Sequence, residues 1–354
     1  MRSEERVEIP QHHLPGGDWE VTLLRAERAR AQALLEQGVR HWPDVVVRTA
    51  DALSRRWLAR SGNPYLPSID SLAAEIGRPG GYFLNINHEW GCTTRAGPTP
   101  DGRSAQLLRV LDWPYEGLGR QVVAAHLDGP AGPWINLTWP GFAGVIQALA
   151  PGRFAAAFNQ APLRRITGLL SLDWAAARRR WWRHDGLPPA HLLRRAFETC
   201  GSYAEAKALL SSAPLALPAI FVLAGCAPEE GCVIERLETA ARVQEARSHG
   251  ATCAANHFTA FPGRWDARGA ESRARAAALA AWRGPEGGPK GGAATDDLAF
   301  LKPPVLNPTT RLALVAEAAG GRLSVLGLEC DGPATEVLRL SSDADRRLTA
   351  ASVP

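Results

Sequence analysis

One cysteine in this chain stands where its neighbours could make it reactive. Cys92 follows Gly91 and precedes two threonines in the stretch NINHEWGCTTRAG, residues 85–97. The other cysteines are scattered, and none forms a Cys-x-x-Cys pair that would indicate a disulfide framework or a metal site. They are Cys200, Cys226, Cys232, Cys253 and Cys330. Two interpretations of Cys92 therefore compete, a half-buried structural residue and a nucleophile.

A cysteine that becomes the first residue of a new chain carries its own base. Its free α-amino group has a pKa of about 8 and can take the thiol proton directly or through one water. No catalytic histidine is then needed. Such a site also requires a cation near the sulfur, a carboxylate that positions the amine, and a side-chain amide that stabilises an oxyanion.

The residues that follow Cys92 supply the cation and the carboxylate. The β-type run LLRVLDW, residues 107–113, contains Arg109 and Asp112. If this run pairs with residues 92–97 as a hairpin about the turn PTPDG, both side chains return alongside Cys92. Considered alone, Arg109 and Asp112 also fit a half-buried ion pair at the end of a strand.

The elements around this hairpin change character near residue 91. Residues 18–42, 43–62 and 68–81 space their apolar side chains at three and four, which predicts helices. Short β-type runs follow, and residues 171–212 return to helical spacing. Two hairpins are predicted later, at 219–238 and 309–330. Strands, then helices, then strands indicate an α+β fold, with a helical segment over 1–91 and a sheet-rich part over 92–354.

Composition limits the partners and the location. The 354 residues include 40 basic and 36 acidic side chains, a net charge of +4, so no nucleic-acid role is forced. The basic aromatic run RRRWWRHD, residues 178–185, is typical of a surface helix with Trp181 or Trp182 buried, although it could stack on a nucleic acid. The N-terminus lacks an apolar h-region and no 18-residue apolar run occurs. We therefore expect no stable membrane insertion and a cytoplasmic location.

Five stretches, in the same order along the chain, resemble one family. The segment GCTTRAGPTPDGRSAQLLRVLDWP is similar to the start of the mature chain in the cysteine N-terminal nucleophile (Ntn) hydrolases. These linear-amide C–N hydrolases include choloylglycine hydrolases, penicillin V acylases, acid ceramidase and N-acylethanolamine acid amidase. The other matching stretches are WINLTWPGFAGVIQALAPGRFAAAFNQAP, ATCAANHFTAF followed by ESRAR, KPPVLNPTTRLALV, and SIDSLAAEIGRPGGYFLNINHEWGCTT. The resemblance is greatest to the acid ceramidase and N-acylethanolamine acid amidase-like subgroup.

This resemblance implies a fold, a maturation step and a reaction. The fold would be a four-layer αββα sandwich, and autocleavage at Gly91–Cys92 would leave an α chain, 1–91, associated with a catalytic β chain, 92–354. The enzyme would hydrolyse small N-acyl amides through an acyl-Cys92 intermediate, without a cofactor or metal. The alternative is an acyltransferase that passes the same acyl group to an amine. A non-enzymatic binding protein is disfavoured because the matched polar positions are all present.

The resemblance also implies the roles of individual residues. Arg109 and Asp112 would hold the α-amino group and the region of the substrate carbonyl. Asn256 would be an oxyanion or amine-positioning donor. Arg273 would be the family's late arginine and Asn159 a second oxyanion contact.

Other residues of these stretches have less specific interpretations. His257 is interpreted as structural because the mechanism needs no ring base, and Cys253 as a core residue. Trp134, Trp139 and Phe142 could line an acyl pocket or fill a sheet core.

Overall fold

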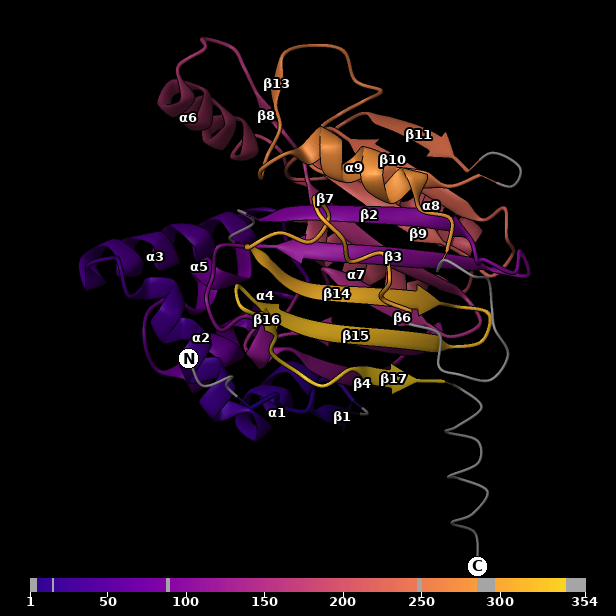
Figure 1. The fold of residues 1–354 in the computed structure, drawn as a ribbon. Coiled ribbons are helices and arrows are strands. Elements are labelled where there is room, and N and C mark those ends of the chain that lie inside the picture. Colours follow the sequence, from indigo (N-terminus) through magenta and orange to yellow (C-terminus); the bar gives the residue numbers. More distant parts are fainter. Residues whose placement is uncertain (1–4, 15, 87–89, 247–249, 285–296, 342–354) are drawn as a thin grey trace, which may run out of the picture.

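Two β-sheets face one another at the centre of the computed structural model, which describes residues 5–14, 16–86, 90–246, 250–284 and 297–341 (Figure 1). The first sheet contains, in spatial order, β1 (Gln11–Leu14), β4 (Val123–Gly129), β5 (Gly132–Thr138), β6 (Gln147–Ala150), β7 (Phe154–Gln160), β9 (Ala219–Ala224), β10 (Gly231–Arg236) and β11 (Ala241–Glu245). The second contains β12 (Thr252–Ala254), β2 (Gly91–Pro98), β3 (Ala105–Asp112), β14 (Thr310–Glu317), β15 (Arg322–Glu329) and β16 (Gly332–Pro333), with β17 (Leu338–Leu340) also paired to β15. A small separate sheet pairs β8 (Leu163–Arg164) with β13 (Trp265–Asp266).

Helices cover both outer faces of this pair of sheets. On the first sheet lie α7 (Pro189–Thr199) and α8 (Tyr203–Ser212), and on the second lies α9 (Ser272–Ala281), which packs on β2 and β12. The order of layers is helix, sheet, sheet, helix. The predicted α+β fold with four αββα layers is confirmed.

The N-terminal helices gather at one end of the sheets, where β2 begins (Figure 1). They are α1 (Trp19–Ala26), α2 (Arg28–Val39), α3 (Asp44–Arg60), α4 (Leu66–Ile76) and α5 (Gly81–Ile86). Buried Trp57, Leu58 and Leu72 form a second core with Ala143 and Leu217 of the sheet-rich part. Two further helical elements lie between the strands. The short η1 (Gly119–Gln121) connects β3 to β4, and α6 (Leu170–Trp181) follows β8. Within the described residues, no helix is both long and apolar enough to cross a bilayer.

The predicted hairpins are present. β2 pairs with β3 so that Thr94 lies opposite Arg109 and Gly91 lies opposite Asp112. β9 with β10, and β14 with β15, form the two later hairpins. The run QHHL was not predicted as a strand, yet it forms β1 and extends the first sheet parallel to β4.

The strand β2 is buried on both faces, so its side chains contact other layers of the fold on each side. Successive side chains of a strand point to opposite faces. Cys92 joins the core between the two sheets together with Leu107 and Leu111 of β3. Thr93 faces the other way, toward α9, where it contacts Arg275. The nucleophile candidate and its neighbour therefore contact different layers.

Candidate active site

The thiol and the backbone nitrogen of Cys92 are held by different side chains. Cys92 is fully buried at the start of β2. Its Sγ accepts a hydrogen bond from Arg109 Nη2 at 3.0 Å, and its backbone N–H donates to Asn256 Oδ1 at 2.7 Å. Burial raises the pKa of the Cys92 thiol to about 11, although Arg109 beside it acts in the opposite direction. In the intact chain this thiol is therefore protonated at neutral pH.

Arg109 is fixed by hydrogen bonds on every side of its guanidinium. Nε donates to Gln147 Oε1 at 3.0 Å and Nη1 to Asn159 Oδ1 at 2.7 Å. Nη2 also donates to the carbonyl of Phe158 at 3.0 Å. Burial lowers the pKa of Arg109, yet a guanidinium stays protonated in proteins. The structure thus holds a rigid cation against the Cys92 sulfur.

Asn159 lies inside the cluster and has two sets of partners. Its Oδ1 accepts from Thr94 Oγ1 at 2.8 Å as well as from Arg109. Its Nδ2 donates to the carbonyls of Ala254 and Ala255 at 3.0 and 3.2 Å. The contacts that the structure gives Asn159 position Arg109, and its role as an oxyanion donor stays a prediction.

Asp112 is buried between a hydroxyl and a guanidinium. Oδ1 accepts from Thr310 Oγ1 at 2.8 Å, and Oδ2 accepts from Arg275 Nη1 at 2.9 Å. Burial raises the pKa of the Asp112 carboxyl, and the cation of Arg275 acts to lower it. Because Gly91 lies directly opposite Asp112, the carboxylate stands beside the Gly91–Cys92 bond.

Arg275 occupies the place that the sequence analysis gave to Arg273. Its Nη1 donates to the Cys92 carbonyl at 2.9 Å and its Nη2 to Asn256 Oδ1 at 3.2 Å. Arg273 is exposed. Two helical positions are separated by about 200° around the axis, so Arg273 and Arg275 of α9 face opposite ways. The structure therefore places Arg275 in this cluster and leaves the predicted Arg273 outside it.

Asn256 is held as an acceptor for the Cys92 nitrogen. Its Nδ2 donates to the carbonyl of Gln160 at 3.0 Å, so its Oδ1 faces Cys92 and Arg275. Of the two roles predicted for Asn256, this orientation fits positioning of the amine. The sequence analysis missed Ser272, whose Oγ accepts from the Asn256 backbone N–H at 2.9 Å and lies 2.8 Å from His257 Nδ1.

The contact with Ser272 can be tested. Ser272→Ala removes the acceptor of the Asn256 N–H inside a buried site, and leaving such a donor unpaired costs about 1–3 kcal/mol. We expect kcat to fall about tenfold while the protein stays folded. Ser324→Ala is the matched control, because Ser324 of β15 is a buried serine whose hydrogen bond, to Asp297, lies outside the site. Equal losses of kcat in the two variants would contradict a positioning role for Ser272.

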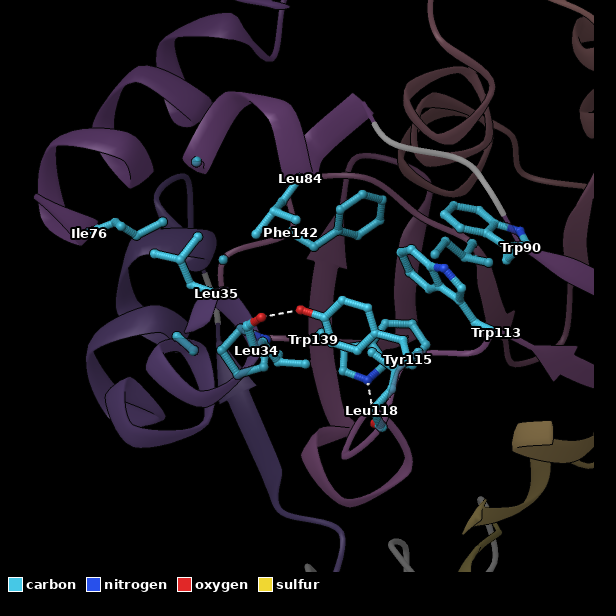
Figure 2. Close-up of a pocket in the computed structure, with 15 residues that line it drawn as sticks. Leu34, Leu35, Ile76, Leu84, Trp90, Trp113, Tyr115, Leu118, Trp139 and Phe142 are labelled. Carbon is cyan, nitrogen blue, oxygen red and sulfur yellow. Dashed lines mark hydrogen bonds between the residues drawn. The ribbon is translucent and has the colours of Figure 1, made fainter. Parts of the chain in front are cut away.

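An apolar cavity begins at the two indoles that flank this cluster. Trp90 and Trp113 lie together with ring centroids 5.3 Å apart, one residue away from Gly91 and Asp112 respectively. In Figure 2 they form one side of the cavity, and Leu35, Leu84 and Ile76 of the N-terminal helices lie on the other. We call this the apolar cavity. It encloses about 660 Å³, its opening to solvent included.

Trp134, Trp139 and Phe142 could each line a pocket or fill a core, and the structure distinguishes these two roles. Trp139 and Phe142 line the apolar cavity (Figure 2), and Trp139 Nε1 donates to the Leu118 carbonyl at 2.9 Å. Trp134 instead stacks on Phe197 in the core, with ring centroids 5.5 Å apart. Trp139 and Phe142 are thus cavity residues, and Trp134 is a packing residue.

No family model matches the chain, but known proteins match part of it. Over 99 residues the chain is 31% identical to acid ceramidase from Pan troglodytes and 30% identical to acid ceramidase from Heterocephalus glaber. Each match covers 28% of this chain and 24% of the relative, so the matched region spans about a quarter of those proteins.

Solved structures extend the likeness to most of the fold. A Caenorhabditis elegans N-acylethanolamine-hydrolyzing acid amidase ortholog superposes with a TM-score of 0.50 at 19% identity, covering 70% of this chain and 100% of that one. A mutant conjugated bile acid hydrolase from Clostridium perfringens superposes with a TM-score of 0.42 at 9% identity, covering 72% and 93%. The chain is thus similar to acid ceramidase over about a quarter of that protein's length, and it shares its fold with the N-acylethanolamine-hydrolyzing acid amidase ortholog.

Proposed function

We propose that this protein hydrolyses linear N-acyl amides through Cys92, acting as an N-terminal nucleophile after cleavage of the Gly91–Cys92 bond. One observation carries the proposal: the sulfur and the nitrogen of a single residue are each held by a buried side chain, Arg109 and Asn256. A packed structural cysteine needs neither contact. A nucleophile whose own amine is its base needs both.

Maturation would use the same groups. The Cys92 thiol adds to the Gly91 carbonyl carbon, the C–N bond breaks, and the acyl group passes from nitrogen to sulfur. The break of the C–N bond frees the α-amino group of Cys92, and water then cleaves the thioester, which frees the Gly91 carboxylate and the thiol. A side chain at position 91 would crowd the site, because a Cβ there would lie 3.3 Å from Asp112 Cβ. This close approach explains the glycine.

In the mature site the α-amino group would take the thiol proton, and the thiolate would attack the amide carbonyl of the substrate. The α-ammonium returns a proton to the departing amine, leaving acyl-Cys92. Water attacks this thioester and releases the acid. The two buried guanidiniums, Arg109 and Arg275, lie within hydrogen-bond distance of Cys92 atoms and offset the negative charge that develops there.

The apolar cavity is proposed as the site of the acyl chain. Its lining is hydrophobic, and it starts at Trp90 and Trp113, beside the residues that flank the Gly91–Cys92 bond. Leu34, Leu35 and Leu84 supply part of the lining from the segment before the cleavage point. The cleaved segment would therefore be part of the binding site.

Buried polar contacts would keep the two chains together after cleavage. Asn63 Nδ2 lies 2.7 Å from His191 Nδ1, and Tyr65 Oη donates to Glu198 at 2.7 Å. Glu20 of α1 is ion-paired with Arg194 of α7. Separating the chains would break these buried contacts, which strongly disfavours dissociation.

An acylation experiment tests this function. Incubation with a p-nitrophenyl ester of a fatty acid should add the acyl mass to the 92–354 chain, and Cys92→Ala should show no adduct. Cys200→Ala, which removes another buried free cysteine, should be acylated like the wild type. An adduct that persists in Cys92→Ala would overturn the proposal. With an amine present at millimolar concentration, amide as the main product would assign an acyltransferase instead.

A further inference from the structure

The guanidinium of Arg109 is fully buried, and no carboxylate among the described residues contacts it. In the intact chain its hydrogen-bond acceptors there are all neutral. They are Gln147 Oε1, Asn159 Oδ1, Thr94 Oγ1, the Phe158 carbonyl and the Cys92 sulfur. A buried charge is costly unless an opposite charge accompanies it. The site therefore holds a cation whose charge its contacts do not offset.

The other guanidinium at the site is neutralised. Three charged side chains act on the Cys92 thiol, namely Arg109, Asp112 and Arg275. Arg275 Nη1 forms an ion pair with Asp112 Oδ2 at 2.9 Å. The other Asp112 oxygen accepts from Thr310 Oγ1, so the carboxylate acts on Arg109 at longer range. A thiolate that forms on Cys92 would thus be the anion in contact with Arg109.

Gln147 of β6 holds Arg109 from the facing sheet through an amide whose orientation is fixed. Gln147 is fully buried. Its Nε2 donates to the Leu137 carbonyl at 2.6 Å, and its Oε1 accepts from Arg109 Nε at 3.0 Å. A carbonyl only accepts and a guanidinium only donates, so these two neighbours determine which end of the amide faces Arg109. An ionised glutamate could accept from Arg109 but could not donate to Leu137. The surroundings therefore fit a neutral side chain.

We infer that Gln147 is a positioning residue for the reaction of Cys92, because it fixes the Arg109 guanidinium against the sulfur through a neutral amide and so leaves the positive charge available to the thiolate. The inference rests on the proposed function. A carboxylate at position 147 would also hold the guanidinium, but it would offset part of its charge. Gln147 thus both places the cation and preserves its effect on the sulfur.

The variant Gln147→Glu separates charge from position. It keeps an acceptor for Arg109 Nε and adds a counter-ion. We expect the midpoint of the pH profile of Cys92 alkylation to rise, so that the cleaved enzyme reacts with iodoacetamide about tenfold more slowly at neutral pH. Alkaline pH should restore the rate, whereas a merely structural contact would lower it equally at every pH. The mass of the N-terminal peptide of the 92–354 chain reports the alkylation of Cys92.

Gln106→Glu is the matched control. Gln106 is a buried glutamine of β3 that lies opposite Gly97. Because side chains alternate along a strand, it faces the other side of the sheet from Arg109. The same charge change at position 106 should leave the midpoint of the pH profile unchanged. An equal rise in both variants would reflect any added buried negative charge and would overturn the inference.

Acylation by the p-nitrophenyl ester separates this inference from the proposed function. If the wild type forms no acyl-Cys92 with the ester, the proposed function fails. If the wild type forms acyl-Cys92, and Gln147→Glu is acylated at the wild-type rate at neutral pH with a wild-type pH profile, only the present inference is overturned.

Gln147→Met supplies the second test should Gln147→Glu fail to fold or to cleave. Methionine is neutral and of similar length, but it has no oxygen to accept from Arg109 Nε. The guanidinium would then be held on one side fewer and would lie less firmly against the Cys92 sulfur. The midpoint of the pH profile must therefore rise in this variant as well, by less than in Gln147→Glu. An unchanged midpoint would show that Gln147 does not position Arg109 and would contradict the inference.

Discussion

Cys92→Ala is expected to leave the chain in one piece and to abolish amide hydrolysis. The wild type should instead purify as two associated chains of about 10 and 28 kDa, estimated from the residue counts on either side of Gly91–Cys92. The physical reason is that cleavage and catalysis would use the same sulfur, which Arg109 holds in the intact chain. Denaturing electrophoresis and the mass of the smaller chain measure the result.

Two controls make this outcome specific. Cys253→Ala alters the cysteine opposite Arg95 on the neighbouring strand β12, and it should cleave normally. The N-terminus of the larger wild-type chain should be Cys92. A wild-type protein that hydrolyses amides as a single uncleaved chain would refute the maturation step, because the amine that acts as the base would still be part of a peptide bond.

The hairpin that carries the nucleophile was predictable because its contacts are local. Residues 92–97 and 107–112 are joined by a short turn, and a two-residue side-chain period fixes which positions share a face. Arg109 thus had to return beside Cys92 once the strands were assigned. The later hairpins were predictable for the same reason.

The structure places Arg275 in the cluster and leaves the predicted Arg273 outside it, because a linear motif does not specify a helix face. Ser272, Arg275 and Leu279 of α9 are buried, at a spacing of three and four that marks one side of the helix. Arg273 falls off that stripe. Applying the helical period to ESRARAAALAA, with Leu279 as the reference, would have selected Arg275. The resemblance of ESRAR to the family's motif instead selected Arg273, two residues before Arg275.

The cavities could not be predicted because each is assembled from segments distant in sequence. A second cavity is lined by residues as distant in sequence as Trp57, Phe83, Gln160 and Trp181, and no local pattern encodes that meeting. The run at 178–185 was predicted as a surface helix with Trp181 or Trp182 buried, and both indoles are partly buried against the N-terminal helices. Contacts between segments distant in sequence determine where these indoles lie.

Asp112→Asn is expected to lower turnover about 10²-fold or more. The carboxylate accepts from Arg275 Nη1 and from Thr310 Oγ1, and it lies beside the residue whose amine would act as the base. An amide in its place removes the negative charge and leaves Arg275 buried with less compensation. Losing a positioned acid–base partner costs a rate on this scale. The measurement is kcat of the cleaved variant, with thermal unfolding to check the fold.

Asp70→Asn is the matched control for this change. Asp70 also accepts hydrogen bonds from an arginine, Arg55, at 2.8 and 2.9 Å, and from Tyr82, but it lies on α4 away from Cys92. Its loss should reduce stability slightly and leave kcat unchanged. If Asp112→Asn cleaves and turns over at nearly the wild-type rate, Asp112 serves only to neutralise Arg275. The α-amino group of Cys92 would then be oriented by Asn256 alone, the side chain that already accepts its N–H in the intact chain.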